Sequence, residues 1–187
     1  MISDTFLKNT KDKPPSKLLL EALPFVSTVD RALDLGCGAF KDTKYLLEKG
    51  FVVDAVDSGE NVAVMAPQHE RLNFHNLSFS EFDYKEGLYD IVNAQFALPF
   101  AHPDTFADMW SRVIGSVKTG GVFTGQFFGP EDDFSNNQEM TFFERQAVEE
   151  MFATFEVRTF VESRRTSKTA TGRDKFWHIF DVIAVRV

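Results

Sequence analysis

The stretch A-L-D-L-G-C-G-A-F-K at residues 32–41 predicts how this chain folds. Its apolar first half is typical of a buried strand, and the two glycines separated by one residue predict a sharp turn that a helix then continues. Glycine at both places also lets the backbone come close to a ligand that a Cβ would obstruct. We therefore expect a valine at Gly36 or Gly38 to abolish ligand binding while the protein stays folded.

The turn lacks the third glycine of the dinucleotide-binding pattern G-x-G-x-x-G, because Lys41 stands in its place. That glycine permits close packing of helix and strand beside a pyrophosphate. Its absence argues against NAD and FAD and favours a nucleoside ligand without phosphates. Lys41 and Asp42 are interpreted as first-turn helix residues, with a ligand contact as the alternative.

The residues after the turn complete a strand–turn–helix–strand unit. Residues 41–50, K-D-T-K-Y-L-L-E-K-G, predict a helix that ends at a glycine, and residues 51–56, F-V-V-D-A-V, predict a second strand. Asp57 follows this strand about 20 residues after the glycine turn, where a crossover unit places an acidic residue against ribose hydroxyls. A helix cap or turn former is the alternative reading of such an aspartate.

Residues 32–58 resemble motifs I and II of the class I S-adenosylmethionine-dependent methyltransferases. Residues 41–43, K-D-T, are similar to the R-D or R-N found after the turn in the tellurite-resistance and thiopurine type of small-molecule methyltransferase. The resemblance implies S-adenosylmethionine as the cofactor. It assigns roles to five residues: Asp34, Gly36 and Gly38 around the methionine moiety, Asp57 on the ribose and Ser58 beside the adenine.

Two later segments extend this resemblance. Residues 80–84, S-E-F-D-Y, look like the third acidic position of the family, which implies that Asp83 accepts a hydrogen bond from the adenine amino group and that the Tyr84 backbone meets the ring. Residues 89–95, Y-D-I-V-N-A-Q, look like the fourth strand, whose carboxyl end at Ala94 and Gln95 flanks the sulfonium.

Helical and strand patterns alternate along the remainder of the chain. Helices are predicted at residues 18–26, 61–66, 105–117 and 141–152, and strands at 73–79, 89–95, 155–161 and 176–187, with the fifth strand beginning after the glycine pair at 120–121. This order predicts an α/β fold with a Rossmann-like, doubly wound, seven-stranded sheet, mostly parallel with an antiparallel last strand. We expect one methyltransferase domain over residues 1–187. Residues 1–16 are expected to be a flexible arm, which in the resembling family can fold over the cofactor as a lid.

Composition limits the partners. With 28 acidic and 20 basic residues the chain carries a net charge of −8, which disfavours a nucleic-acid substrate. The single cysteine, Cys37, is read as a packing residue, and the four histidines lack the paired spacing of metal ligands. No run of residues is long and apolar enough to span a bilayer. We expect a cytoplasmic protein without a metal, and oligomeric state is not predicted.

The methyl acceptor is expected to approach from the loops after the fourth and fifth strands, because ligands bind outside the carboxyl ends of parallel strands. Phenylalanines in these loops are candidates to line an acceptor pocket, with core packing as the alternative: Phe96, Phe100, Phe128 and Phe134. His102 is a candidate base, although Pro103 favours a helix start there. Methyl transfer needs no obligatory catalytic residue, so none is predicted.

The basic segment at residues 163–175, S-R-R-T-S-K-T-A-T-G-R-D-K, is read as a solvated hairpin tip or as a loop that selects an anionic acceptor. In the second case, replacing Arg164 and Arg165 by alanine would raise the acceptor KM. The predicted function is methyl transfer from S-adenosylmethionine to a small-molecule acceptor. The alternative is a non-catalytic S-adenosylmethionine-binding sensor or assembly partner.

Overall fold

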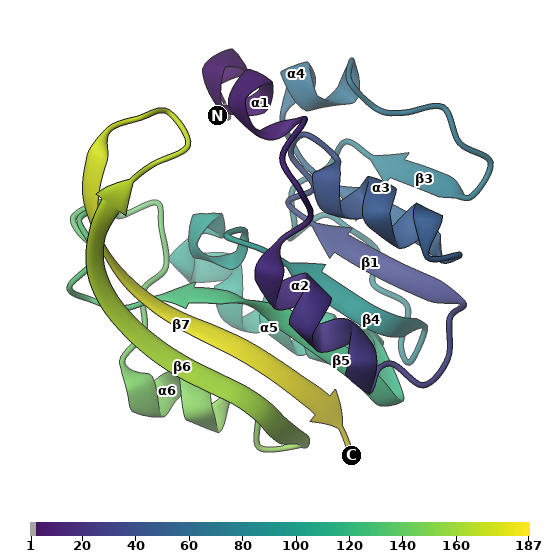
Figure 1. The fold of residues 1–187 in the computed structure, drawn as a ribbon. Helices are drawn as coiled ribbons and strands as arrows, with labels where there is room; N and C mark the ends of the chain where they lie inside the picture. The colour runs from purple at the N-terminus through teal and green to yellow at the C-terminus, as the bar shows by residue number, and fades with distance from the viewer. Residues whose placement is uncertain (1–2) are drawn as a thin grey trace.

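The computed structural model describes residues 3–187 and arranges them around one seven-stranded sheet (Figure 1). The strands are β1 (Arg31–Leu35), β2 (Val52–Val56), β3 (Leu72–His75), β4 (Tyr89–Ala94), β5 (Val117–Phe128), β6 (Phe155–Lys168) and β7 (Asp174–Arg186). Their order in the sheet is β3-β2-β1-β4-β5-β7-β6, and β7 is antiparallel to both of its neighbours, whereas the pairs from β3 to β5 are parallel. The predicted sheet, with its antiparallel last strand, is confirmed.

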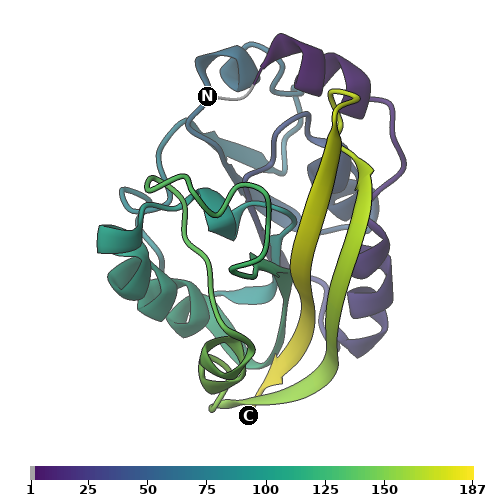
Figure 2. The ribbon, with the colours of Figure 1, turned by 90° about the vertical axis from the view of Figure 1, so that its left-hand side faces the viewer.

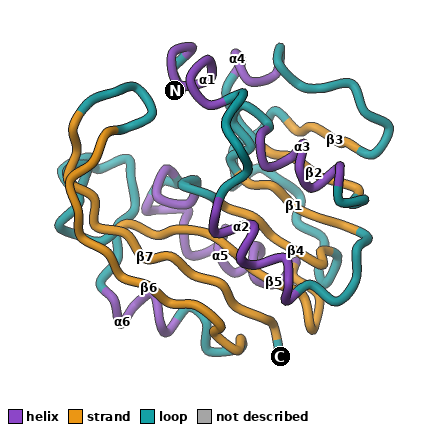
Figure 3. The backbone as a smooth tube through the Cα atoms, in the orientation of Figure 1, coloured by secondary structure: helices purple, strands orange, loops and turns teal. Residues whose placement is uncertain are grey.

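Helices cover both faces of the sheet, as the tube in Figure 3 shows. On one face lie α2 (Lys17–Ala22) and α3 (Lys41–Glu48), and on the other lie α5 (Pro103–Ser116) and α6 (Arg145–Glu150). Apolar residues three and four apart form the buried stripe of α5: Phe106, Met109, Trp110 and Val113. Strands alternate between the faces, so Ala32 packs on the α2–α3 side and Leu33 on the α5–α6 side.

The strand order reverses at β1, which has β2 on one side and β4 on the other. Carboxyl ends of parallel strands meet at one edge of a sheet, and ligands of such folds bind at the point of reversal. This edge is called the carboxyl rim below. It carries Asp34 at the end of β1, Asp57 just after β2, and Asn93 near the end of β4.

The predicted arm at residues 1–16 contains a helix, α1 (Asp4–Thr10). The Ser3 hydroxyl caps it by accepting the N–H of Phe6, and Leu7 is buried in the core on the α2–α3 face. Residues 1 and 2 lie outside the described residues, and flexibility of the arm stays a prediction. In Figure 1 this helix lies beside α4 (Glu60–Ala63), above the carboxyl rim.

The β6–β7 hairpin is longer than predicted, because pairing continues to Lys168 and Asp174 rather than ending near Val161. Figure 2 shows the hairpin reaching up to α1. There the side-chain amide of Asn9 donates to the Ala170 carbonyl at 2.9 Å. The basic segment is thus mostly strand, with a tip at residues 169–173.

Several other element bounds differ from prediction, among them α4, which ends at Ala63 rather than at residue 66. β3 ends at His75 rather than at residue 79, and the α2 segment ends at Ala22 before a short 3₁₀ helix, η1 (Leu23–Phe25). The helix expected at 141–152 is confined to α6 because Thr141 donates its backbone N–H to the Pro99 carbonyl in η2 (Leu98–Phe100). Among residues 3–187, no helix has the length and apolar character required to cross a bilayer.

Candidate functional site

The glycine turn between β1 and α3 has a left-handed backbone. Gly36 has φ of 70° and Gly38 has φ of 49°, values that favour glycine, and Phe40 at the start of α3 has φ of 60°. The N–H of Gly36 donates to the Val56 carbonyl at 2.8 Å, which joins the turn to the end of β2. The predicted strand, turn and helix therefore occur at the residues that the sequence indicated.

Asp57 is buried and holds the turn from the side of β2. One carboxylate oxygen accepts the N–H of Gly38 at 3.0 Å, and the other accepts the N–H of Gly59 at 2.9 Å. Burial raises the pKa of Asp57, and these two backbone donors oppose that effect. A carboxylate has about four lone-pair positions, so each oxygen retains room for one further donor. Ser58, the next residue, is exposed.

Asp34 is also buried at the rim. Its carboxylate accepts hydrogen bonds from the Thr43 hydroxyl of α3 and from the Asn93 side chain of β4, the latter at 2.8 Å. Burial, reinforced by the nearby charge of Asp42, raises the pKa of Asp34 to about 7. The Asp34 carboxylate thus connects the end of β1 to α3 and to β4.

From Asn93 a chain of side-chain amides continues along the rim. Gln95 donates to Asn93 Oδ1 at 2.9 Å, and Gln126 of β5 donates to Gln95 Oε1 at 3.1 Å and to the Asp181 carboxylate of β7 at 3.0 Å. The Gln126 carbonyl oxygen accepts the N–H of Phe96 at 2.9 Å. We call Asn93, Gln95 and Gln126 the amide chain; it connects the Asp34 and Asp181 carboxylates. Sequence reasoning identified Gln95 but missed the other two.

The two residues predicted to contact the adenine, Asp83 and Tyr84, lie in the loop after β3, where Tyr84 contacts α5. Asp83 is exposed and pairs with Lys85. Tyr84 donates its hydroxyl to the Phe79 carbonyl at 2.9 Å, and its ring lies under the Arg112 guanidinium of α5. The Phe79 ring, by contrast, is 3.4 Å from the position that a Cβ on Gly36 would take. Phe79 therefore lies nearer the glycine turn, and the adenine roles of Asp83 and Tyr84 stay predictions.

Asn76 is a second rim residue that the sequence analysis missed. It follows β3 directly, as Asp57 follows β2, and its amide donates to the carbonyl of Asp57 at 2.8 Å. Its position directly after a strand could have identified it, but the predicted strand 73–79 ran past this residue.

Gly36 and Gly38 have different surroundings. A Cβ on Gly36 would lie 2.5 Å from the Cβ of Ala97, a buried residue in the loop after β4, whereas the nearest atom to a Cβ on Gly38 is a ring carbon of Phe6 at 3.6 Å. Valine at Gly36 would therefore disturb packing, contrary to the expectation that either substitution leaves the core intact. Gly38 is the position at which ligand approach can be tested separately.

The first turn of α3 holds the N-terminal arm. The buried Asp42 carboxylate accepts the backbone N–H of Ser16 at 2.6 Å and its hydroxyl at 2.7 Å, and Lys41 donates to the Ser16 hydroxyl. Both residues lie in the first helical turn, as interpreted, and they also fix the chain that leads from α1 to α2. Phe6 of α1 thereby lies against Gly38.

Three of the four candidate phenylalanines gather around Trp177 of β7. Its ring centroid lies 5.8 Å from that of Phe96, 5.7 Å from that of Phe128 and 6.4 Å from that of Phe134. Phe128 is buried, while Phe96 is 41% exposed. Phe100 is 55% exposed on η2. The candidate phenylalanines therefore differ. Phe128 packs in the interior, whereas Phe96 exposes part of its ring beside the amide chain.

Lys175 is buried beneath this aromatic group. Its ammonium pairs with the fully buried Asp132 and lies 3.6 Å from the Trp177 ring centroid. Burial lowers the pKa of Lys175, and the Asp132 carboxylate opposes that shift. The pair joins β7 to the loop after β5.

Other candidates have structural contacts. His102 accepts the N–H of Asp104 at 3.2 Å as the N-cap of α5, which confirms the helix-start reading. Cys37 is buried in the core on the α2–α3 face. Within residues 3–187, no three His, Cys, Asp or Glu side chains form a group that could hold a metal ion.

Several charged side chains of the basic segment are already engaged in ion pairs. Arg164 pairs with Glu131 at 2.9 Å and with Glu162 at 2.6 Å, so its guanidinium is engaged by two carboxylates. Lys168 pairs with Asp174 at 3.0 Å. Arg165, which faces the Trp177 side of the hairpin, donates to Ser163 and is exposed. Selection of an anion by Arg164 conflicts with these pairs, because a ligand would have to displace them.

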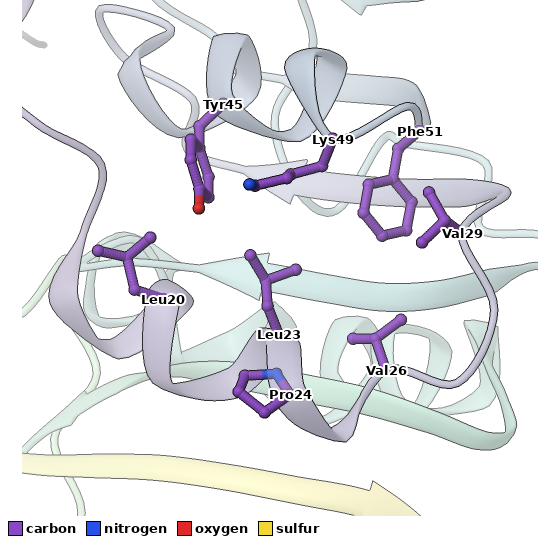
Figure 4. Close-up of a pocket in the computed structure, with 8 residues that line it drawn as sticks. All are labelled: Leu20, Leu23, Pro24, Val26, Val29, Tyr45, Lys49 and Phe51. Atoms are coloured by element: carbon purple, nitrogen blue, oxygen red, sulfur yellow. The ribbon is translucent and has the colours of Figure 1, made fainter.

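A groove of about 370 Å³ lies elsewhere, between α2–η1 and α3 (Figure 4). Leu20, Leu23 and Tyr45 line it, together with Val29 before β1 and Phe51 before β2. It therefore lies at the amino ends of the strands, on the edge opposite the glycine turn, and has no part in the site described above.

The sequence matches a family model described as Tellurite resistance protein TehB over residues 4–158. A curated relative, Alpha N-terminal protein methyltransferase 1 of Arabidopsis thaliana, is 30% identical over 102 residues. That alignment covers 49% of this chain but only 37% of the plant protein, so the chain spans well under half of that relative.

Solved structures share the fold at low identity. TehB from Haemophilus influenzae superposes with a TM-score of 0.78 at 16% identity, covering 97% of this chain and 66% of that one. The Burkholderia thailandensis 1,6-didemethyltoxoflavin-N1-methyltransferase, solved with bound 1,6-didemethyltoxoflavin and S-adenosylhomocysteine, superposes with a TM-score of 0.71 at 21% identity. This second match covers 98% of this chain and 81% of that one.

Proposed function

The chain belongs to the tellurite resistance protein TehB family, whose members are class I S-adenosylmethionine-dependent methyltransferases, and we propose that its methyl acceptor is a small molecule. The single observation that carries the assignment of the cofactor site is that the Asp57 carboxylate fixes the glycine turn at the rim while its oxygens retain acceptor positions. Few other ligand groups match two adjacent acceptors beside a glycine turn as well as a ribose diol does.

The residues present fit this cofactor. We assign the Asp57 carboxylate to the ribose hydroxyls, and Asp34 with the Gly36–Gly38 backbone to the methionine moiety. Ser58 is assigned to the adenine side, together with Asp83 and Tyr84 from the sequence and Asn76 and Phe79 from their position at the rim. Ala94 and Gln95, at the end of β4, are assigned to the sulfonium side. When bound, the cofactor supplies a methyl group already activated by the sulfonium.

In the transfer, a lone pair of the acceptor forms a bond to the methyl carbon, the carbon–sulfur bond breaks, and its electrons pass to the sulfur. A protonated acceptor also releases one proton. The protein's contribution is alignment and exclusion of water. We assign alignment to the amide chain, and exclusion of water to α1 and the hairpin tip, which meet at Asn9 and Ala170. The N-terminal arm is thereby proposed to act as a lid.

Several observations favour a small acceptor. The net charge of −8 opposes a polyanionic substrate. The partly exposed ring of Phe96 lies beside the amide chain and offers an apolar contact next to polar groups. The Burkholderia structure, on the same fold, has 1,6-didemethyltoxoflavin bound. We further propose a single methyltransferase domain that acts in the cytoplasm.

The test is methyl transfer itself. The protein is incubated with methyl-labelled S-adenosylmethionine and a desalted or complete metabolite extract, and labelled small products and S-adenosylhomocysteine are quantified. Product that requires the low-molecular-weight fraction supports the proposal. Cofactor binding without any donor consumption would instead support the sensor alternative, which the absence of an identified base keeps open. As a matched control, Asp57→Ala should lose turnover, whereas Glu156→Gln on β6, an exposed carboxylate, should retain it.

A further inference from the structure

Asp181 differs from the buried aspartates of this chain. Those carboxylates each have two or more donors or a cation, as at Asp54, Asp57, Asp90 and Asp132. Asp181 is partly buried, and among residues 3–187 its hydrogen-bond partner is Gln126 alone, with no Lys, Arg or His within ion-pair distance. Because Asp181 keeps part of its surface exposed, its carboxylate retains acceptor positions for a further donor.

The sheet places Asp181 on the face where an acceptor would lie. It pairs with Gln126 across β5 and β7, and Phe128 pairs with Ile179 two residues along. Side chains two apart on a strand share a face, so Trp177, Ile179 and Asp181 point to the same side. Phe96 joins this side through its ring contact with Trp177 and its backbone bond to Gln126.

The amide chain connects this carboxylate to the cofactor side. Gln126 bonds Asp181 and Gln95 with the same amide nitrogen, and Gln95 is at the end of β4 proposed to flank the sulfonium. Each side-chain amide of the amide chain is oriented by its hydrogen-bond partners. Rotation of the Gln126 amide group would break its hydrogen bond with the Phe96 backbone N–H. Asp181 is therefore linked to the end of β4 through Gln126.

We propose that Asp181 is a specificity-determining residue that selects acceptors bearing a cationic or N–H donor group, with the Phe96 and Trp177 rings contacting an apolar or aromatic part of the same molecule. The chemistry is that of a carboxylate accepting from a charged donor, next to ring faces that attract cations. An oxyanion such as tellurite is disfavoured at this position. The inference rests on the proposed function, because it takes the acceptor to bind beyond Gln95.

The test compares one molecular skeleton in three charge states. Binding of phenethylamine, 2-phenylethanol and phenylacetate is measured by calorimetry on the full chain saturated with S-adenosylhomocysteine. The wild type should bind the amine most tightly and the carboxylate least tightly. Asp181→Asn should lower the preference for the amine over the alcohol by about tenfold, the loss expected when a hydrogen bond to a charged group is removed.

Two further variants keep the result interpretable. Glu156→Gln removes an equal charge from an exposed site on β6 and should leave the preference unchanged. Phe96→Leu should weaken all three ligands by about threefold without changing their order, because it removes ring contact and no charge.

Absence of amine binding, or the same preference in Asp181→Asn as in the wild type, would overturn the inference. Tighter binding of phenylacetate would overturn it too, and would assign selection to the exposed Arg165. Saturation with S-adenosylhomocysteine is measured first. Failure at that step contradicts the proposed function, whereas normal saturation without charge preference contradicts only the role of Asp181.

Discussion

The carboxylate of Asp57 accepts the backbone N–H of Gly38 at 3.0 Å, so the end of β2 fixes the turn that follows β1. The side chain proposed to bind the ribose is therefore also part of the structure of the turn. Loss of this carboxylate would leave the Gly38 and Gly59 N–H groups without their acceptors. The proposed ribose contact and the local stability of the turn therefore depend on the same side chain.

We expect Asp57→Ala to lower the free energy of unfolding by about 1 to 3 kcal/mol, because two buried donors lose their partner. Asp57→Asn keeps one acceptor oxygen and should lose less. Urea unfolding followed by circular dichroism measures both. Equal stability of the wild type and Asp57→Ala would show that the turn does not depend on the carboxylate.

The two glycines should respond differently to alanine. Gly38→Ala should cost about 1 to 2 kcal/mol of stability, from the left-handed backbone alone, while weakening S-adenosylhomocysteine binding. Gly36→Ala should cost more, because its Cβ would lie 2.5 Å from that of Ala97. Thermal unfolding and calorimetry separate the two effects. Undiminished binding by folded Gly38→Ala would mean that the turn does not contact the ligand.

Asp34 should make stability depend on pH. Its pKa is raised from 3.8 to about 7 in the folded protein, so the native state keeps a proton that the unfolded chain has already lost. The contribution of this group to stability therefore falls as pH rises from about 4 to about 7. Relative to the wild type, Asp34→Asn should become more stable between about pH 5 and about pH 8, by on the order of 2 kcal/mol. Urea unfolding at both pH values tests this; a constant difference between the two proteins contradicts it.

Asp132 and Lys175 form a buried ion pair, with side chains 0% and 3% exposed. Asp132→Asn leaves the ammonium buried without its counter-ion and should cost about 3 to 5 kcal/mol. Asp174→Asn, which removes the exposed partner of Lys168, serves as the control and should cost little. Chemical unfolding compares the two variants, and similar losses would show that burial of the first pair is unimportant.

The arm should be released by Ser16→Ala, which removes the hydroxyl that bonds Asp42 and Lys41. We expect faster hydrogen–deuterium exchange in α1, because its connection to α3 is weakened. Ser135→Ala, at an exposed serine in the loop after β5, is the control. Unchanged exchange in α1 would show that other contacts of α1 suffice to hold the arm.

The glycine turn, the position of Asp57 and the mostly parallel sheet with its antiparallel last strand could be predicted, because they depend on local patterns and on the general geometry of crossover units. The end of β3 could not, because residues 76–79 still alternate as a strand would, so the position of Asn76 directly after β3 was not recognised. The hydrogen bond between Gln126 and Asp181 could not be predicted from the sequence either.

That bond joins residues 55 apart, on antiparallel strands whose register no local pattern specifies. The contacts of Arg164 with Glu131 and Glu162 were missed for the same reason. In each case, long-range pairing decided which side chains meet at the rim.

The most direct test of the cofactor site is calorimetric titration of S-adenosylhomocysteine and NAD into the wild type and Asp57→Ala. We expect micromolar-range binding of S-adenosylhomocysteine by the wild type, no comparable binding of NAD, and a loss of about 1 to 3 kcal/mol of binding free energy in folded Asp57→Ala. Preference for NAD, or equal affinity of the two proteins for S-adenosylhomocysteine, would contradict the account.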